Sequence, residues 1–349
     1  MKESSSSNFL VSFAAFIIII AGLKIASGFI VPFFLALFFA IVCLPLFHFF
    51  HQKGIPDWLS LIVIFLLIFV VLGFVGVIIS TSVQEFTENL PEYQQNFNNL
   101  IHKTFAFANK HGIKLPQKRL INIFNPSFLI RYTATSLKSF GSVMSNSLFT
   151  ILVVIFILTE SATFSKKLAY IAKTPKTVTY FETFLSNVAR YMALKTFTSI
   201  ATGIIVTLML WIIGVHYAFL WGLSAFLLNY IPTIGSIIAA IPPIILSLIQ
   251  FGISRTIIVL AGYLIINFAI GNIIEPKIMG KGLGLSTLVV FLSLVFWGWV
   301  FGPVGMFLSV PLTMVVKIAL DSQENSRWIA VMLDNDVPLN AEKSSTRQK

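Results

Sequence analysis

Long apolar runs are the feature that most constrains the fold of this chain. Several windows of about 20 residues carry almost no charge, and residues 61–79 carry none. About 20 helical residues are enough to cross the roughly 30 Å hydrocarbon core of a bilayer. A membrane β-barrel would alternate polar and apolar residues, and these runs do not. The sequence therefore predicts an all-α polytopic integral membrane protein.

Uninterrupted apolar runs predict six spanning helices, at residues 9–27, 29–47, 58–80, 143–159, 196–213 and 257–274. Composition divides the chain into spans one to three at 1–81, a polar and mainly helical extracytoplasmic insert at 82–142, span four at 143–162, a cytoplasmic amphipathic linker at 163–195, a transmembrane core with two broken helical segments at 196–320 and a cytoplasmic polar tail at 321–349. The linker is rich in lysine and arginine, and basic loops favour the cytoplasmic side of a membrane.

Proline and glycine interrupt two apolar segments of the core, at residues 218–249 and 285–318. Both residues free backbone groups, which must then meet protein or water rather than lipid. Paired interruptions of this kind are typical of the central site of a transporter. The pattern predicts two re-entrant helical hairpins, and two long kinked helices are the alternative. The predicted gate or hinge residues are Pro232, Gly235, Pro242, Pro243, Gly280, Gly282, Gly284, Gly302, Pro303, Gly305 and Pro311.

A carboxylate stands at the end of the last uninterrupted span. Glu275 continues a line at four-residue spacing through Tyr263, Asn267 and Gly271, and Pro276 after it is expected to end the helix. A buried carboxylate is costly when charged, which makes Glu275 a candidate proton carrier. Alternatively, Glu275 lies at the membrane interface and pairs with a lysine of the next turn, either Lys277 or Lys281.

Asparagine and tyrosine side chains supply the remaining polar groups near the breaks. Asn229 and Tyr230 precede Pro232, where they could contact a solute or satisfy backbone carbonyls that the proline leaves free. Asn272 lies one turn before Glu275. The candidate transport or coupling residues are therefore Glu275, Asn267, Asn272, Asn229 and Tyr230.

Several functions are disfavoured by the sequence. The chain has no pair of intramembrane aspartates, no HExxH motif and no complete nucleophile motif, so an enzyme is not expected. Cys43 is its single cysteine, and neither a metal site nor a cofactor is predicted. The net charge of +11 is spread between the apolar runs, which indicates contact with anionic lipid of the bilayer and not with nucleic acid.

Three strings carry a resemblance to a known family. They are IVPFFLALFFAIV, LNYIPTIGSIIAAIPPI and GNIIEPKIMGKGLGLSTLVVFLSLVFWGWVFGPVGMFLSVPLT. The chain resembles the autoinducer-2 exporter family, also called PerM-like permeases, over nearly all of its length.

The resemblance implies a multi-pass protein of the bacterial inner membrane that exports autoinducer-2, a small polar quorum-sensing signal. It also implies a homo-oligomer such as a pentamer. In this interpretation the two hairpins form the barrier, and Glu275 is the residue that would couple export to proton entry. Two alternatives stay open: a sodium/proton or other monovalent cation antiporter of the same family, and a scaffold that does not transport.

Overall fold

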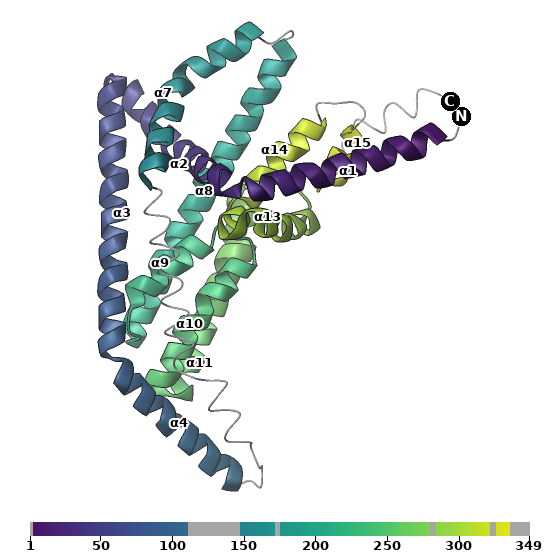
Figure 1. The fold of residues 1–349 in the computed structure, drawn as a ribbon. Coiled ribbons are helices and arrows are strands. Elements are labelled where there is room, and N and C mark those ends of the chain that lie inside the picture. The colour runs from purple at the N-terminus through teal and green to yellow at the C-terminus, as the bar shows by residue number, and fades with distance from the viewer. Residues whose placement is uncertain (1–2, 111–146, 172–174, 280–283, 322–325, 336–349) are drawn as a thin grey trace. The chain divides into compact units, whose positions relative to one another are not determined.

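The computed structural model describes residues 3–110, 147–171, 175–279, 284–321 and 326–335 (Figure 1). Most of these residues are helical, in the order α1 (Glu3–Ile25), α2 (Ser27–Gln52), α3 (Asp57–Glu88), α4 (Leu90–Lys110), α7 (Ser147–Ile171), α8 (Pro175–Ile213), α9 (Ala218–Leu228), α10 (Ile234–Phe251), α11 (Ile253–Phe268), the π-helix η1 (Ala269–Ile274), α12 (Glu275–Met279), α13 (Thr287–Phe307), α14 (Ser309–Asp321) and α15 (Arg327–Met332). The chain forms two compact units: Met1–Leu61, Phe149–Leu194 and Ile278–Lys349 make the first unit, and Ile62–Leu148 and Lys195–Lys277 make the second.

Six stretches of the described helices are long and apolar enough to cross a membrane: Ser27–Gln52, Asp57–Glu88, Leu185–Ile213, Ile234–Phe251, Ile253–Ile278 and Thr287–Phe307. The all-α polytopic prediction is confirmed. The set differs from the predicted spans, however, because Phe13–Ile25 and Phe149–Glu160 are shorter apolar stretches, whereas α10 and α13 of the broken segments are long enough. Large apolar side chains such as Phe69 and Val77 are exposed along α3, as a surface that faces lipid requires.

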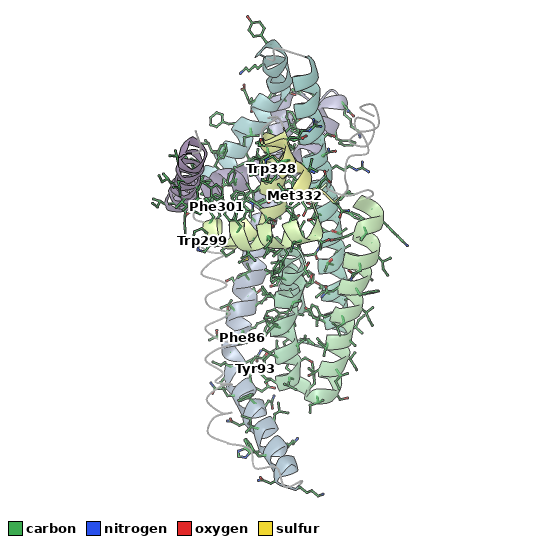
Figure 2. All side chains as sticks on the ribbon, turned by 90° about the vertical axis from the view of Figure 1, so that its right-hand side faces the viewer. Phe86, Tyr93, Trp299, Phe301, Trp328 and Met332 are labelled. Atoms are coloured by element: carbon green, nitrogen blue, oxygen red, sulfur yellow. The ribbon has the colours of Figure 1, made fainter. Side chains whose placement is uncertain are left out.

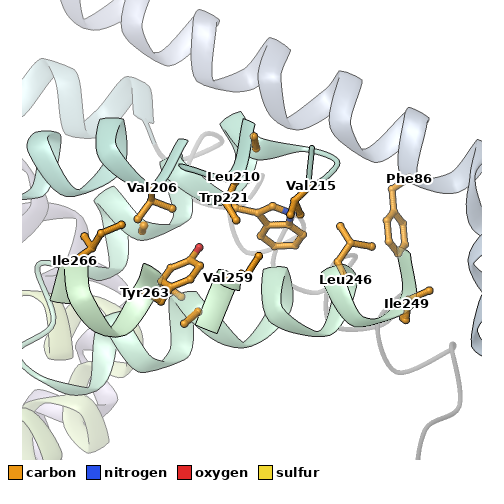
Figure 3. Packing of buried hydrophobic residues seen from close by; sticks show 14 of the residues in the cluster. Phe86, Val206, Leu210, Val215, Trp221, Leu246, Ile249, Val259, Tyr263 and Ile266 are labelled. Atoms are coloured by element: carbon orange, nitrogen blue, oxygen red, sulfur yellow. The ribbon is translucent and has the colours of Figure 1, made fainter. Parts of the chain in front are cut away.

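The core of the second unit lies among α8, α9, α10 and α11. Val206, Trp221, Leu246 and Val259 each come from a different one of these helices (Figure 3). Helices α8 and α9 approach closely at Gly222, where a Cβ would collide with the Thr207 hydroxyl. Small residues permit such backbone contact between membrane helices.

The end of α3 and the start of α4 also pack against this core. Phe86 and Tyr93 lie side by side at the junction, with ring centroids 5.7 Å apart (Figure 2). Both side chains belong to the buried core cluster, so the first helix of the predicted insert is part of the second unit.

The first broken segment is an antiparallel helical hairpin. At its open end, the backbone N–H of His216 donates to Gln250 Oε1 over 3.3 Å. At its tip, Gly235 packs so tightly on Leu228 that a Cβ would collide with the Leu228 carbonyl oxygen. Helix α9 has 11 residues, roughly 16 Å of helix and about half of a hydrocarbon core. This segment is therefore a hairpin and not one long kinked helix.

The second broken segment turns at Gly302. This glycine has φ 68° and ψ −151°, a backbone conformation that side chains disfavour. Pro303 then begins the next helical turn, a position where its missing N–H costs nothing. A Cβ at Gly305 would collide with the carbonyl oxygen of Trp297, and the indole N–H of Trp297 donates to Thr313 Oγ1 over 2.9 Å. In both broken segments, a glycine after the break thus packs on a carbonyl of the limb before it.

The prediction that the helix ends at Glu275 and Pro276 is wrong. The chain continues from α11 through η1 into α12, and the N–H of Glu275 donates to the carbonyl of Ile270, five residues earlier. A proline ring clashes with the carbonyl four residues before it in a regular helix, and the wider π turn directly before Pro276 relieves that clash.

The π turn also changes which residues share a face. The buried side of this helix runs through Val259, Tyr263, Ile266 and Ile270, at successive steps of four, three and four positions. Glu275, five residues after Ile270, continues that side because the π turn holds one extra residue. The predicted four-residue line is therefore not the buried one, and Gly271 is exposed.

Candidate functional site

A row of polar side chains is buried on the inner face of α8. Lys195, Thr198, Ser199 and Thr202 are all buried, and they recur at the three- and four-residue spacing of one helix face. The hydroxyl of Thr202 donates to the carbonyl of Thr198 over 2.8 Å. The ammonium group of Lys195 and the hydroxyl of Thr198 can bond to side chains of other helices in the second unit.

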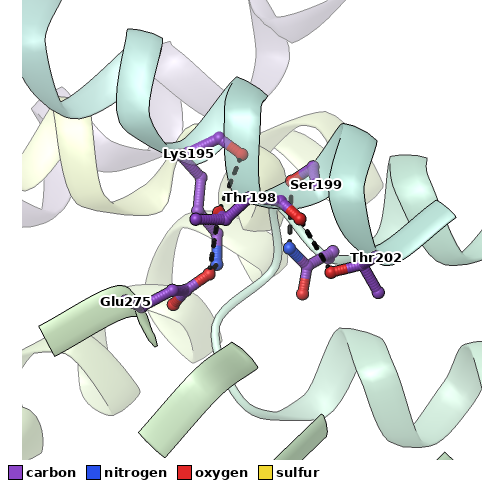
Figure 4. Close-up of polar contacts among 6 residues, drawn as sticks. Lys195, Thr198, Ser199, Thr202 and Glu275 are labelled. Carbon is purple, nitrogen blue, oxygen red and sulfur yellow. Dashed lines mark hydrogen bonds and ion pairs between the residues drawn. The ribbon is translucent and has the colours of Figure 1, made fainter. Parts of the chain in front are cut away.

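The ammonium group of Lys195 pairs with the carboxylate of Glu275. Lys195 Nζ lies 2.5 Å from Glu275 Oε1, and the two side chains are only 7% and 17% exposed (Figure 4). Thr198 Oγ1 lies 3.1 Å from the same carboxylate oxygen and 3.1 Å from the carbonyl of Lys195, so its hydroxyl can donate to either. Two charges removed from water in this way depend on each other, because either one alone would be buried without compensation.

This pairing corrects one prediction. In the interfacial alternative, Glu275 pairs with Lys277 or Lys281; the structure instead pairs it with Lys195, while Lys277 is exposed and Lys281 lies outside the described residues. The π turn directs Glu275 toward α8, so its partner comes from a residue that the sequence placed at the end of a cytoplasmic linker.

The spacing of apolar residues in the sequence does indicate that Lys195 is buried. Helix α8 runs without a break from Pro175 to Ile213, and its buried face includes Val188, Tyr191 and Met192 before it reaches Lys195. Lys195 follows Tyr191 by four residues and Met192 by three, so it occupies the apolar face of the same helix. A charged side chain in that position needs a buried partner.

The tip of the first hairpin binds to the same stretch of α8. The Asn229 amide donates from Nδ2 to Ser199 Oγ over 3.0 Å, and the Tyr230 hydroxyl donates to Thr196 Oγ1 over 2.8 Å. Both residues are buried. Asn229, Tyr230 and Glu275 therefore converge on one turn and a half of α8, and we call this group, with Lys195, Thr196, Thr198 and Ser199, the α8 polar cluster.

The other predicted residues lie elsewhere. Asn267 is half-buried and Asn272 is exposed, and neither takes part in the hydrogen bonds described for the α8 polar cluster. Pro232 is at the hairpin tip, and Pro242 and Pro243 lie inside α10. In the first unit, Gly302, Pro303 and Gly305 form the turn of the second broken segment, Pro311 lies in the first turn of α14, and Gly284 precedes α13. Gly280 and Gly282 lie outside the described residues.

The opposite end of the hairpin is held by a second polar group. The Tyr93 hydroxyl lies 2.7 Å from His216 Nδ1 and 2.9 Å from the Tyr217 hydroxyl, and Asn89 Nδ2 donates to Tyr217 over 3.1 Å. Burial, and then the hydrogen bond with Tyr217, raises the pKa of the Tyr93 phenol, which keeps it neutral. The hairpin is thus anchored at its tip by α8 and at its base by α4.

The α8 polar cluster combines an ammonium group, a carboxylate, an amide and several hydroxyl groups without net charge. Such a set can exchange hydrogen bonds with a neutral polar solute and can hold a proton on its carboxylate. Among the described residues, no group of three or more His, Cys, Asp or Glu side chains is arranged to bind a metal ion.

The Asn229 bond can be measured by a double-mutant cycle. We expect Asn229→Ala and Ser199→Ala each to lower thermal stability in detergent, and the double variant to lose less than the sum, because one bond links the two side chains. The coupling should be about 0.6 to 1.7 kcal/mol, as for other hydrogen bonds between membrane helices. Additive losses would show that the tip is not held by this bond.

Comparison with known proteins identifies the family. The profile of the AI-2E family transporter matches residues 13–325. A putative transport protein of Haemophilus influenzae is 42% identical over 331 residues, which are 93% of this chain and 95% of that protein. The AI-2 transport protein TqsA of Escherichia coli K12 is 39% identical over 320 residues, 91% of this chain and 93% of its own.

A third relative, the putative transport protein YhhT of Escherichia coli K12, is 34% identical over 332 residues, 95% of each chain. Residues 13–325, which the family profile matches, include both broken segments and the α8 polar cluster. Together with the six membrane-length helices, it indicates a multi-pass membrane protein. The chain belongs to the AI-2E family of transporters.

Proposed function

We propose that this protein exports autoinducer-2 from the bacterial cytoplasm across the inner membrane. The observation that carries the proposal is the buried α8 polar cluster, which joins a hairpin tip to a charge-balanced set of donors and acceptors. A neutral polar molecule can replace such hydrogen bonds one by one without an isolated charge being left behind. The relative in Escherichia coli is named an AI-2 transport protein, which supports this solute.

In this proposal the two broken segments act as gates in a homo-oligomer such as a pentamer. The first hairpin contributes Asn229 and Tyr230 to the solute site, and the turn at Gly302 closes the second gate. The N-terminus, the basic linker at 163–195 and the tail at 321–349 face the cytoplasm, and the insert at 82–142 faces outward.

Proton entry would supply the driving force through Glu275. When Glu275 binds a proton, the pair with Lys195 loses its negative member and Lys195 remains as a buried positive charge. That state is unfavourable in a medium of low polarity, so it favours a conformation in which water reaches Lys195. Loss of the proton on the other side restores the pair and closes the cycle.

Uptake of labelled autoinducer-2 into inverted membrane vesicles tests the proposal. Vesicles that contain the protein should accumulate the solute when their interior is acidic, because the interior corresponds to the outside of the cell. A protonophore should abolish the gradient-dependent part of uptake. Uptake no greater than in vesicles without the protein would contradict an export function.

The buried carboxylate also favours one competing function, exchange of sodium or another monovalent cation for protons. Glu275 is a largely buried carboxylate inside the second unit, and an antiporter needs a carboxylate there that can take up and release a proton. In the same vesicles, an antiporter would move protons upon addition of sodium in the absence of autoinducer-2. That result, without solute uptake, would assign the antiporter function.

A further inference from the structure

The polar tail returns to the start of the second broken segment. Residues 326–335, here called the C-terminal strap, comprise Ser326, α15 and the three residues after α15. The backbone N–H of Ser286 donates to the carbonyl of Leu333 over 3.0 Å, a bond between segments almost 50 residues apart. Ser326 Oγ donates to the carbonyl of Leu320 over 2.7 Å, so the strap is also attached to the end of α14.

A lysine of α14 connects the strap to the same place. Lys317 Nζ lies 2.6 Å from Asp334 Oδ2 and also donates to the carbonyl oxygen of Gly284. The two charged side chains are 17% and 30% exposed, so this ion pair is shielded from solvent much better than an ordinary surface pair. The ammonium group of Lys317 therefore connects α14 to the strap at Asp334 and to Gly284, shortly before α13.

The backbone at Gly284 is shaped for this contact. Gly284 has φ 63°, and a Cβ there would stand 2.8 Å from Lys317 Nζ and 3.6 Å from Asp334 Oδ1. Ser286, two residues later, accepts a hydrogen bond from the backbone N–H of Val289 and so caps α13. The strap thus holds the residues that set where α13 begins.

The strap is a packed element with an inner and an outer side. Ala330 is buried, whereas Trp328 and Met332 are 65% and 73% exposed on the same short helix (Figure 2). A solvated tail would bury neither an alanine nor an ion pair. The strap accordingly adds structure to the first unit beyond the polar tail that composition predicts.

We propose that Lys317 and Asp334 are positioning residues for transport: through the C-terminal strap they hold Gly284 to Ser286 and so fix the start of the second broken segment. The first limb of this segment ends at the turn at Gly302, inside α13, so the ion pair lies at one end of that limb and the turn at the other. Release of the strap frees the entry to α13 without touching the α8 polar cluster. The inference goes beyond autoinducer-2 export and does not depend on the solute.

Cysteine labelling of the full chain in membranes tests the strap. In a Cys43→Ala background, Leu285→Cys places a thiol at a position that is 7% exposed between the two anchored residues. Asp334→Asn should increase its rate of reaction with a maleimide by about tenfold or more, equivalent to about 1.4 kcal/mol of protection. Asp334→Glu should restore protection, since it restores the charge.

Asp321→Asn is the matched control, because Asp321 makes an exposed ion pair with Arg327 of the same strap at 3.4 Å. This change removes the same charge and should leave the labelling rate within about twofold, as exposed pairs contribute little. Unchanged labelling in Asp334→Asn, or equally fast labelling in Asp321→Asn, would overturn the proposal.

Transport by the same variants in the vesicle assay provides the second readout. The maximal rate should fall about tenfold in Asp334→Asn and recover in Asp334→Glu, while the solute concentration at half-maximal rate stays constant. Faster labelling with a normal transport rate would overturn the positioning role. Failure of the natural chain to move autoinducer-2 would count against the proposed solute alone, because labelling still decides whether Asp334 holds the entry to α13.

Discussion

Glu275→Gln is expected to remove the dependence of transport on the proton gradient and to destabilise the protein strongly. The amide cannot carry the negative charge, and Lys195 then remains buried without a counter-charge. Loss of one partner from a buried ion pair costs about 3 to 5 kcal/mol. Thermal unfolding in detergent and gradient-driven uptake into vesicles measure the two effects separately.

The double variant Lys195→Met/Glu275→Leu separates folding from coupling. Apolar side chains of similar size can replace a buried pair with little loss of stability, so the double variant should unfold within about 2 kcal/mol of the natural chain. Its transport should nevertheless be independent of the proton gradient.

Glu160→Gln is the matched control for Glu275→Gln, because Glu160 pairs with Lys167 on an exposed surface and such pairs contribute about 1 kcal/mol or less. Gradient-dependent transport by Glu275→Gln would exclude Glu275 as the coupling group.

Gly235→Ala and Gly305→Ala are expected to cause the second large effect, loss of most folded protein. In each case the added methyl group would collide with a carbonyl oxygen of the preceding limb, Leu228 or Trp297. A backbone oxygen cannot move aside as a side-chain end can, so each hairpin must open or bend. Overpacking of this kind costs about 1 to 3 kcal/mol and more where backbone is involved. The amount of monodisperse protein extracted from membranes measures the effect.

Two other glycines provide graded controls. A Cβ at Gly262 would collide with Met209 Sδ, the flexible end of a side chain, so Gly262→Ala should reduce stability only moderately. A Cβ at Gly73 meets nothing within 4 Å, and Gly73→Ala should be neutral or stabilising by up to about 1 kcal/mol. Equal losses at all of these positions would contradict collision at the turns as the cause, because helix propensity alone favours alanine over glycine.

Hydropathy and the positions of proline and glycine predict much of this architecture, because both act over a few neighbouring residues. Continuous apolar runs identify the membrane helices, and the breaks at Pro232 and Gly302 mark where the chain turns. The same local reasoning identifies Glu275, Asn229 and Tyr230 as candidate residues, and the structure brings these three together on α8.

The partner of Glu275 is not predicted, for two physical reasons. A period of 3.6 residues, carried through the π turn, places Glu275 on the wrong face of its helix. Lys195 comes directly after a basic region, so its charge looks like part of a solvated linker although α8 continues through it. Contacts between segments 80 residues apart depend on helix packing, which the spacing of residues within one helix does not determine.

The π turn before Pro276 changes the direction in which side chains point between the two parts of one membrane helix. Each residue of a regular helix advances the side-chain direction by roughly 100°, so the extra residue in η1 rotates everything after it by about that angle. Before the turn, the buried side of the helix runs from Val259 to Ile270. After the turn, the carboxylate of Glu275 lies on that same side. A change of a few backbone hydrogen bonds from the π pattern to the regular pattern would therefore rotate the carboxylate out of reach of the ammonium group, while the part of the helix before the turn stays in place.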